Sequence, residues 1–120
     1  MNTPIDIASW MANPCALPKL VRDQIPAILT ESRVKFKYEL ASDEAAYRAF
    51  LTRKLVEEAF EAKSALIVPQ LVQELADIFE VIDAILQEYG IDRDEVLRVQ
   101  EGKRAGRGGF ESRIVLVECE

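Results

Sequence analysis

Residues 43–89 read DEAAYRAFLTRKLVEEAFEAKSALIVPQLVQELADIFEVIDAILQEY, and this stretch decides the fold. Apolar side chains recur three and four residues apart on both sides of Pro69, which is the spacing of amphipathic helices. Pro69 interrupts the first helix but suits the first turn of a second one. Because the connection is short, the two helices are expected to be antiparallel neighbours.

The ends of these helices carry local signals. Ser42 is a good N-cap for the first helix, which we expect to run to about Val68. The second helix is expected to continue from Pro69 to Tyr89. Gly90 follows as the residue that ends it, because glycine adopts the left-handed conformation at low cost.

Shorter elements are predicted on both sides of this hairpin. Pro26 favours a short helix over residues 26–32, and strict apolar–polar alternation predicts a strand over residues 34–40. Asp92 is the expected cap of a third helix that runs to about residue 105. The apolar residues 114–117 predict a second strand, a partner for the first.

The predicted fold class is therefore mainly α, an antiparallel helical bundle with a small two-stranded β element at about residues 34–40 and 113–118. Residues 1–18 hold three of the five prolines and are expected to form an N-terminal arm. Residues 19–120 are expected to form one domain, which agrees with the chain length of 120 residues.

Two pairs of carboxylates occupy the predicted hairpin. Glu58 and Glu61 have i, i+3 spacing, as do Glu74 and Asp77, and twelve residues separate the pairs. On a helix this spacing puts both side chains of a pair on one face. The first pair lies within an apolar stripe, where an ionised carboxylate is costly without a compensating partner. Both pairs lie close to the Pro69 connection, so they are expected to approach each other.

A hard divalent cation would compensate several converging carboxylates, and oxygen ligands favour Mg²⁺, with Mn²⁺ as a possible substitute. The alternative is that the acidic residues form a solvated face or pair with Lys and Arg, as acidic residues on helices commonly do. The chain contains no histidine, which removes Ser-His and Cys-His nucleophile systems and His-based zinc sites. Water is then the expected attacking group.

Two groups of cations could bind a phosphate-bearing substrate. Lys19 and Arg22 form the first group, and Lys103, Arg104 and Arg107 form the second, next to Gly108 and Gly109. Glycines would let backbone N–H groups approach an anion. The alternative for the second group is an ordinary helix C-terminus, where basic residues and glycine are favoured.

Composition limits the partners further. The formal net charge is −6, which argues against binding of nucleic-acid polymers, and no apolar stretch reaches the length of a membrane span. The N-terminus has neither the basic start nor the apolar run of a signal peptide. Cys15 and Cys119 are expected to be free thiols in a reducing cytoplasm, although the terminal segments could meet in a disulfide.

The carboxylate spacing resembles the signature of the MazG-like all-α nucleoside triphosphate pyrophosphatases. The similarity covers about residues 19–117 and includes three stretches that resemble the phosphoribosyl-ATP pyrophosphohydrolase-like subgroup. These stretches are KLVRDQIP at residues 19–26, ELADIFEVIDA at residues 74–84, and KR with RGGF at residues 103–110.

This resemblance implies hydrolysis of a nucleoside triphosphate to the monophosphate and pyrophosphate, with Mg²⁺ held by the four carboxylates. It also implies that Glu57 orients or activates water, and that the subunits form a homodimer or a dimer of dimers. Substrate phosphates would contact the cations at the matching positions, which are Lys19, Arg22, Lys54, Lys103, Arg104 and Arg107.

Three functions remain open at this level. The first is a house-cleaning pyrophosphohydrolase for non-standard nucleotides, and the second is a phosphoribosyl-ATP pyrophosphohydrolase. The third is a non-catalytic helical module for nucleotide binding or dimerisation.

Overall fold

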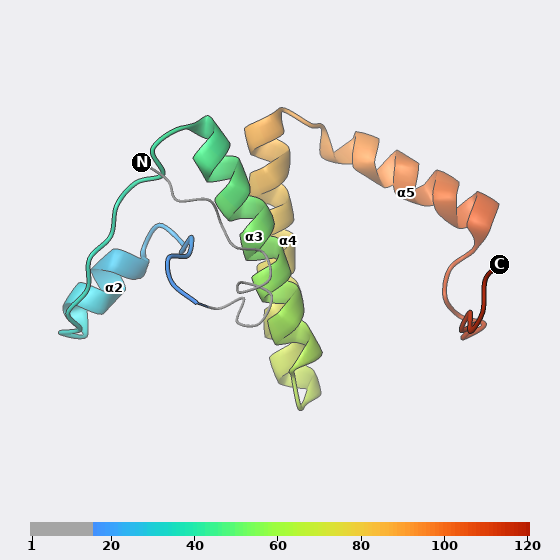
Figure 1. The fold of residues 1–120 in the computed structure, drawn as a ribbon, viewed down its shortest axis with the longest axis horizontal. Coiled ribbons are helices and arrows are strands. Elements are labelled where there is room, and N and C mark those ends of the chain that lie inside the picture. The colour runs from blue at the N-terminus through green and yellow to red at the C-terminus, as the bar shows by residue number, and fades with distance from the viewer. Residues whose placement is uncertain (1–15) are drawn as a thin grey trace.

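The fold is an antiparallel helical hairpin with a shorter helix on either side of it (Figure 1). The structure is a computed structural model and describes residues 16–120. Helices α3 (Glu44–Lys63) and α4 (Val68–Tyr89) form the hairpin, with α2 (Ile25–Glu31) before it and α5 (Arg93–Arg107) after it. The predicted mainly α class is confirmed.

Local sequence signals set the ends of the hairpin helices. The Asp43 side chain caps α3 by accepting a hydrogen bond of 2.8 Å from the Ala46 N–H, so the N-cap is Asp43 and not the predicted Ser42. Helix α3 ends at Lys63, earlier than the predicted Val68, and residues 64–67 make the connection. The Gln70 side chain accepts from the Leu66 N–H at 3.1 Å and stabilises this turn.

The end of α4 and both ends of α5 lie at or near the predicted residues. Gly90 ends α4 in the left-handed conformation with φ 65°, and the Ile91 N–H donates to the Leu86 carbonyl at 2.9 Å. Asp92 caps α5 by accepting from the Asp94 N–H at 3.0 Å. Helix α5 continues to Arg107, slightly beyond the predicted end near residue 105, because Gly106 does not interrupt it.

The predicted β element at residues 34–40 and 113–118 is absent from the described part of the chain. Paired strands lie about 5 Å apart. Residues 34–40 connect α2 to α3, whereas residues 113–118 follow α5 on the opposite side of the hairpin (Figure 1). The two segments therefore cannot pair as β-strands within one chain. Residues 34–40 alternate apolar and polar side chains but have no partner strand beside them.

The hairpin is held by a small core and by contacts at its open end. The apolar residues buried within the described range are Ala46, Leu51 and Val81. At the open end, the Arg48 guanidinium lies 4.2 Å from the centre of the Tyr89 ring and donates to Glu88 at 3.3 Å. A cation–π contact of this kind contributes about 0.5–1 kcal/mol at an exposed site. Arg48 therefore joins the start of α3 to the end of α4.

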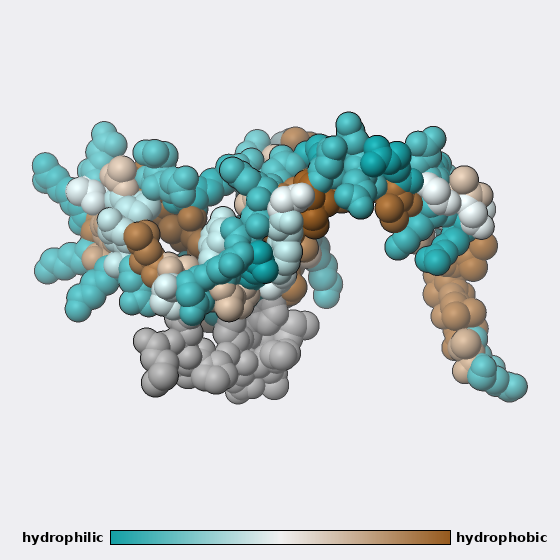
Figure 2. Space-filling model, turned by 90° about the horizontal axis from the view of Figure 1, so that it is seen from above, coloured by the Kyte–Doolittle hydropathy of each residue, from teal (hydrophilic) through white to brown (hydrophobic). Residues whose placement is uncertain are grey.

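Much of the apolar surface remains uncovered. Phe79 on α4 is 60% exposed, and Ile114 to Val117 are between 79% and 86% exposed. Figure 2 shows the C-terminal segment as a brown column at one end of the molecule. Within residues 16–120 there is no helix whose length and apolar character would suit a membrane crossing. The predicted N-terminal arm, residues 1–18, lies outside the described residues except for its last three.

Candidate metal site

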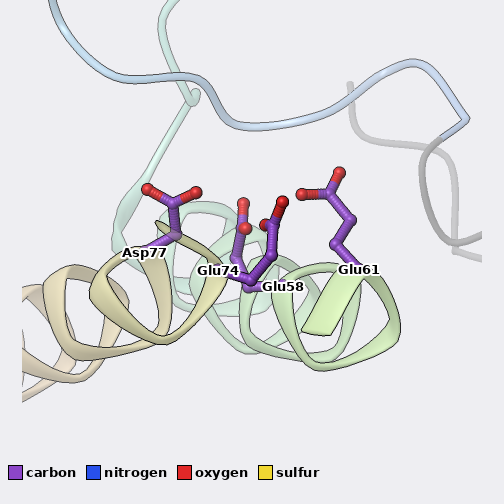
Figure 3. Close-up of side chains that lie close together, drawn as sticks. All are labelled: Glu58, Glu61, Glu74 and Asp77. Carbon is purple, nitrogen blue, oxygen red and sulfur yellow. The ribbon is translucent and has the colours of Figure 1, made fainter. Parts of the chain in front are cut away.

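The four predicted ligands meet at the interface of α3 and α4. Glu58 and Glu61 come from α3, and Glu74 and Asp77 come from α4. One carboxylate oxygen from each residue lies within 4.8 Å of the others, and all four side chains point to the same side of the hairpin (Figure 3). The structure thus brings together the two pairs that the sequence predicted to approach each other.

Burial makes this cluster unusual for acidic side chains. Glu58 is only 5% exposed, although the carboxylates of three other residues lie beside it. Glu58 Oε2 and Glu74 Oε2 are both buried, and neither has a hydrogen-bond partner among residues 16–120. A buried acceptor without a partner costs about 1–3 kcal/mol, and more when it is charged. The cluster therefore lacks positive charge at its centre.

The crowding and burial of the carboxylates raise the pKa values of two of them, Glu58 and Glu61. Burial raises the pKa of Glu58 above its usual 4.5, the charges of Glu61 and Asp77 raise it further, and Lys54 opposes the change. Burial also raises the pKa of Glu61, followed by a hydrogen bond with Glu74 and the charge of Glu74. Without a cation, the folded protein therefore tends to keep a proton in the cluster.

Glu57 lies beside the cluster but faces different partners. Its side chain is 2% exposed, with Oε1 3.2 Å from Lys19 Nζ and Oε2 3.0 Å from Lys54 Nζ. Lys54 Nζ is also 3.4 Å from Glu58 Oε1. Burial disfavours the charge of Lys54, but Glu57 and then Glu58 raise its pKa above the usual 10.5. Lys54 thus stays charged and lies between Glu57 and the cluster.

Arg22 contacts the cluster directly. Its guanidinium donates to Asp77 Oδ1 at 2.8 Å, across 55 residues of sequence. Both side chains are partly exposed, 57% for Arg22 and 37% for Asp77. Lys19 and Arg22 were predicted as phosphate contacts, and the structure places Lys19 on Glu57, beside the cluster, and Arg22 on Asp77, within it.

The second predicted group of cations lies elsewhere in the chain. Lys103, Arg104 and Arg107 are on α5, which projects away from the hairpin (Figure 1). Arg104 pairs with Glu111, and the three cations line a surface hollow together with Gly108, Gly109 and Phe110. Within one chain they are not brought to the acidic cluster, and their role as phosphate contacts stays a prediction.

One supporting residue was missed from the sequence. Arg53, on α3, donates to the Ala16 carbonyl at 3.0 Å and so attaches the segment before α2 to the hairpin. No local pattern indicates this contact, because it joins residues 37 positions apart. Cys119 is a free thiol, as predicted, and its side chain is exposed, whereas Cys15 lies outside the described residues.

The donor set fits a hard divalent cation. The four groups are all carboxylates, they converge from two helices, and two of their buried oxygens have no partner among the residues that the structure describes. Such oxygen ligands suit Mg²⁺ or Mn²⁺ better than zinc. Comparisons with protein-family models, curated proteins and solved structures find no match for this chain.

Proposed function

We propose that this protein is a Mg²⁺-dependent pyrophosphohydrolase that cleaves a nucleoside triphosphate to the monophosphate and pyrophosphate. The observation that carries the proposal is the set of four carboxylates within 4.8 Å of one another, with the buried Glu58 Oε2 left without a partner in the described part of the chain. The resemblance of the motifs to the MazG-like pyrophosphatases supplies the reaction type.

The cluster residues have separate tasks in this proposal. Glu58, Glu61, Glu74 and Asp77 hold the divalent cation. When bound, Mg²⁺ offsets the charge of the substrate phosphates and helps to activate water, and Mn²⁺ can replace it. Glu61 is less buried than Glu58, so it is the more accessible of the two α3 ligands to a water molecule at the site.

Glu57 and the neighbouring cations position the substrate. Both oxygens of Glu57 already contact lysines, so its proposed role is to hold Lys19 and Lys54 at the edge of the cluster and thereby orient the water and the phosphates. Lys54 and Arg22 lie next to metal ligands, where they can contact phosphate oxygens. Hydrolysis between the α- and β-phosphates then yields pyrophosphate as one product.

The broader setting is part of the same proposal. The substrate is a nucleotide, including non-standard ones, and the enzyme acts as a house-cleaning activity in the cytoplasm. It forms a homodimer or a dimer of dimers, because the exposed apolar residues of α4, such as Phe79, need a cover in water. A second copy would complete the helical bundle that the hairpin begins.

A panel of standard and modified nucleoside triphosphates tests the function. Each is incubated with the protein and Mg²⁺, and pyrophosphate and orthophosphate are measured separately. Pyrophosphate release that stops on chelation is expected. Orthophosphate release without pyrophosphate would reject cleavage at the α–β bond.

The two alternatives give different results in the same panel. Phosphoribosyl-ATP as the single substrate would assign the protein to the narrower pyrophosphohydrolase class. No turnover of any compound, together with no Mg²⁺ binding by calorimetry, would favour a non-catalytic helical module.

A further inference from the structure

Residues 16–22 form a strap across the hairpin, attached at three points. The Ala16 carbonyl accepts from Arg53 at 3.0 Å, Lys19 Nζ lies 3.2 Å from Glu57, and Arg22 lies 2.8 Å from Asp77. Figure 3 shows the pale blue chain crossing above the four carboxylates. The strap therefore lies on the side of the hairpin to which the four carboxylates point (Figure 3).

The attachments differ in strength because they differ in burial. Lys19 contacts Glu57, whose side chain is 2% exposed and has Lys54 as a second partner. Removing one partner from a buried ion pair is costly. The side chains of the Arg22–Asp77 pair are 57% and 37% exposed, and ion pairs this exposed to solvent contribute little to stability. Lys19 thus fixes the strap, whereas Arg22 can leave its partner at small cost.

Asp77 has two competing uses. It belongs to the group of four carboxylates that could hold a cation, and its Oδ1 already accepts from Arg22. A guanidinium at 2.8 Å from a metal ligand would lie close to a doubly charged ion and be repelled by it. Ligation through the other oxygen of Asp77 would still leave two positive charges close together, so the cation and Arg22 compete for Asp77.

We propose that Arg22 is an exchange residue: it neutralises Asp77 while no cation is bound, and it moves to the substrate phosphates when Asp77 becomes a metal ligand. This inference rests on the proposed function. A guanidinium is suited to the second role because it donates in pairs to phosphate oxygens.

The fixed end of the strap keeps the released side chain in place. Arg22 is three residues from Lys19, so its backbone stays within about 10 Å of the Lys19 attachment. The freed guanidinium thus remains beside the cluster and is available to a triphosphate. Metal binding and phosphate binding are then coupled, because binding of the metal releases the Arg22 guanidinium, which then binds phosphate.

Calorimetry on Arg22→Ala tests the exchange with two probes, Mg²⁺ alone and inorganic tripolyphosphate at saturating Mg²⁺. The variant is expected to bind Mg²⁺ about two- to five-fold more tightly, because the competing ion pair is gone. It is expected to bind tripolyphosphate at least about tenfold more weakly, because a charge-assisted contact is lost. These opposite changes distinguish exchange from general damage to the site.

Two further variants control the measurement. Arg98→Ala removes the same charge from an exposed position on α5, and it should leave both affinities as in the unmodified protein. Arg22→Lys keeps the charge but not the paired donors, so Mg²⁺ affinity should be unchanged and tripolyphosphate affinity intermediate. Circular dichroism confirms that each variant remains folded.

Several results would overturn the inference. Unchanged or weaker Mg²⁺ binding by Arg22→Ala would show that Arg22 does not compete for Asp77. Unchanged tripolyphosphate binding would show that Arg22 does not transfer to phosphate. No Mg²⁺ binding by the unmodified protein would reject both the exchange and the proposed function. Binding of both probes without triphosphate hydrolysis would reject the function alone, and the variant affinities would still decide the exchange.

Discussion

The α3–α4 hairpin and the region from α5 to the C-terminus use their charges differently. In the hairpin, Glu57 and Glu58 are buried, and Lys54 contacts both of them. In the C-terminal region, α5 has no buried residue, and Val115 is 80% exposed. The hairpin therefore forms a charged site by itself, whereas the C-terminal region presents cations and apolar residues that this single chain leaves uncovered.

This difference separates the two groups of predicted phosphate contacts. Lys19 and Arg22 reach the acidic cluster through contacts within one chain. Lys103 and Arg107 do not, although they share a surface hollow with Phe110, which is 97% exposed. The first group belongs to the site as it stands, while the second would act at a site only after association with another molecule or copy.

The largest effect is expected from Glu61→Gln, which tests whether the hairpin site is a metal site. The amide keeps the size of the side chain but removes the charge that a cation needs. We expect loss of triphosphate hydrolysis by more than about 100-fold and weaker Mg²⁺ binding, with helicity unchanged. Hydrolysis assays, calorimetry and circular dichroism measure the three quantities.

Glu80→Gln is the matched control for this variant. Glu80 is an exposed acidic residue on α4 outside the cluster, so its amide should behave like the unmodified protein. If Glu61→Gln keeps full activity, the assignment of Glu61 as a metal ligand is wrong.

The next effect concerns the apolar surface of α4, where Phe79 is 60% exposed in the single chain. We predict that Phe79→Lys raises the dimer dissociation constant by at least about 100-fold, because it would put a charge where the proposed interface covers a large aromatic ring. Sedimentation velocity over a concentration series measures this constant.

Val115→Lys tests whether the C-terminal segment belongs to the same dimer interface as Phe79, because it places the same charge in that segment. Dissociation by Phe79→Lys alone would place the interface on the hairpin, and dissociation by both variants would extend it to the C-terminal segment. A monomeric unmodified protein at all concentrations would contradict the homodimer.

The hairpin was predictable because its signals are local. The i, i+3 spacing of Glu58 with Glu61 sets their common face, and Pro69 sets the turn that brings Glu74 and Asp77 back to them. Gly90 and Asp92 fixed the neighbouring helix ends for the same reason. Each of these features depends on residues only a few positions apart.

The wrongly predicted β element and the missed ion pairs depend on contacts distant in sequence. Alternation at residues 34–40 is a property of a strand only where a partner lies alongside, and the predicted partner lies across the hairpin. The Arg22–Asp77 pair joins residues 55 positions apart, and the Lys19–Glu57 pair joins residues 38 apart. No periodicity in the sequence indicates which cation reaches which carboxylate.

A smaller effect on catalysis is expected when the basic group on α5 is removed. We predict that the double variant Lys103→Ala with Arg107→Ala lowers kcat/KM for a triphosphate by no more than about tenfold, mainly through KM, since these cations are not at the cluster in the single chain. Arg98→Ala on the same helix controls for the loss of charge. A decrease as large as that of Glu61→Gln would mean that association brings the group to the cluster.

The smallest effect is a change of stability with pH in the absence of metal. The folded-state pKa values of Glu58 and Glu61 are raised above the usual 4.5, so the folded protein binds more protons than the unfolded chain between 4.5 and these raised values. The contribution of both groups is fully present below 4.5 and is lost as pH rises through the raised values. The melting temperature in EDTA should therefore fall by roughly a few degrees as the pH rises from 4.5 through the raised pKa values.

Mg²⁺ should oppose this loss most strongly at the upper end of the window, because a cation binds the deprotonated carboxylates. Thermal unfolding at several pH values, with EDTA and with Mg²⁺, measures both dependences. Glu61→Gln should flatten the dependence in EDTA, since one of the two raised carboxyls is then absent. An unchanged slope in that variant would mean that Glu61 does not contribute to the pH dependence, and the crowding at Glu61 would then have no measurable cost in the folded protein.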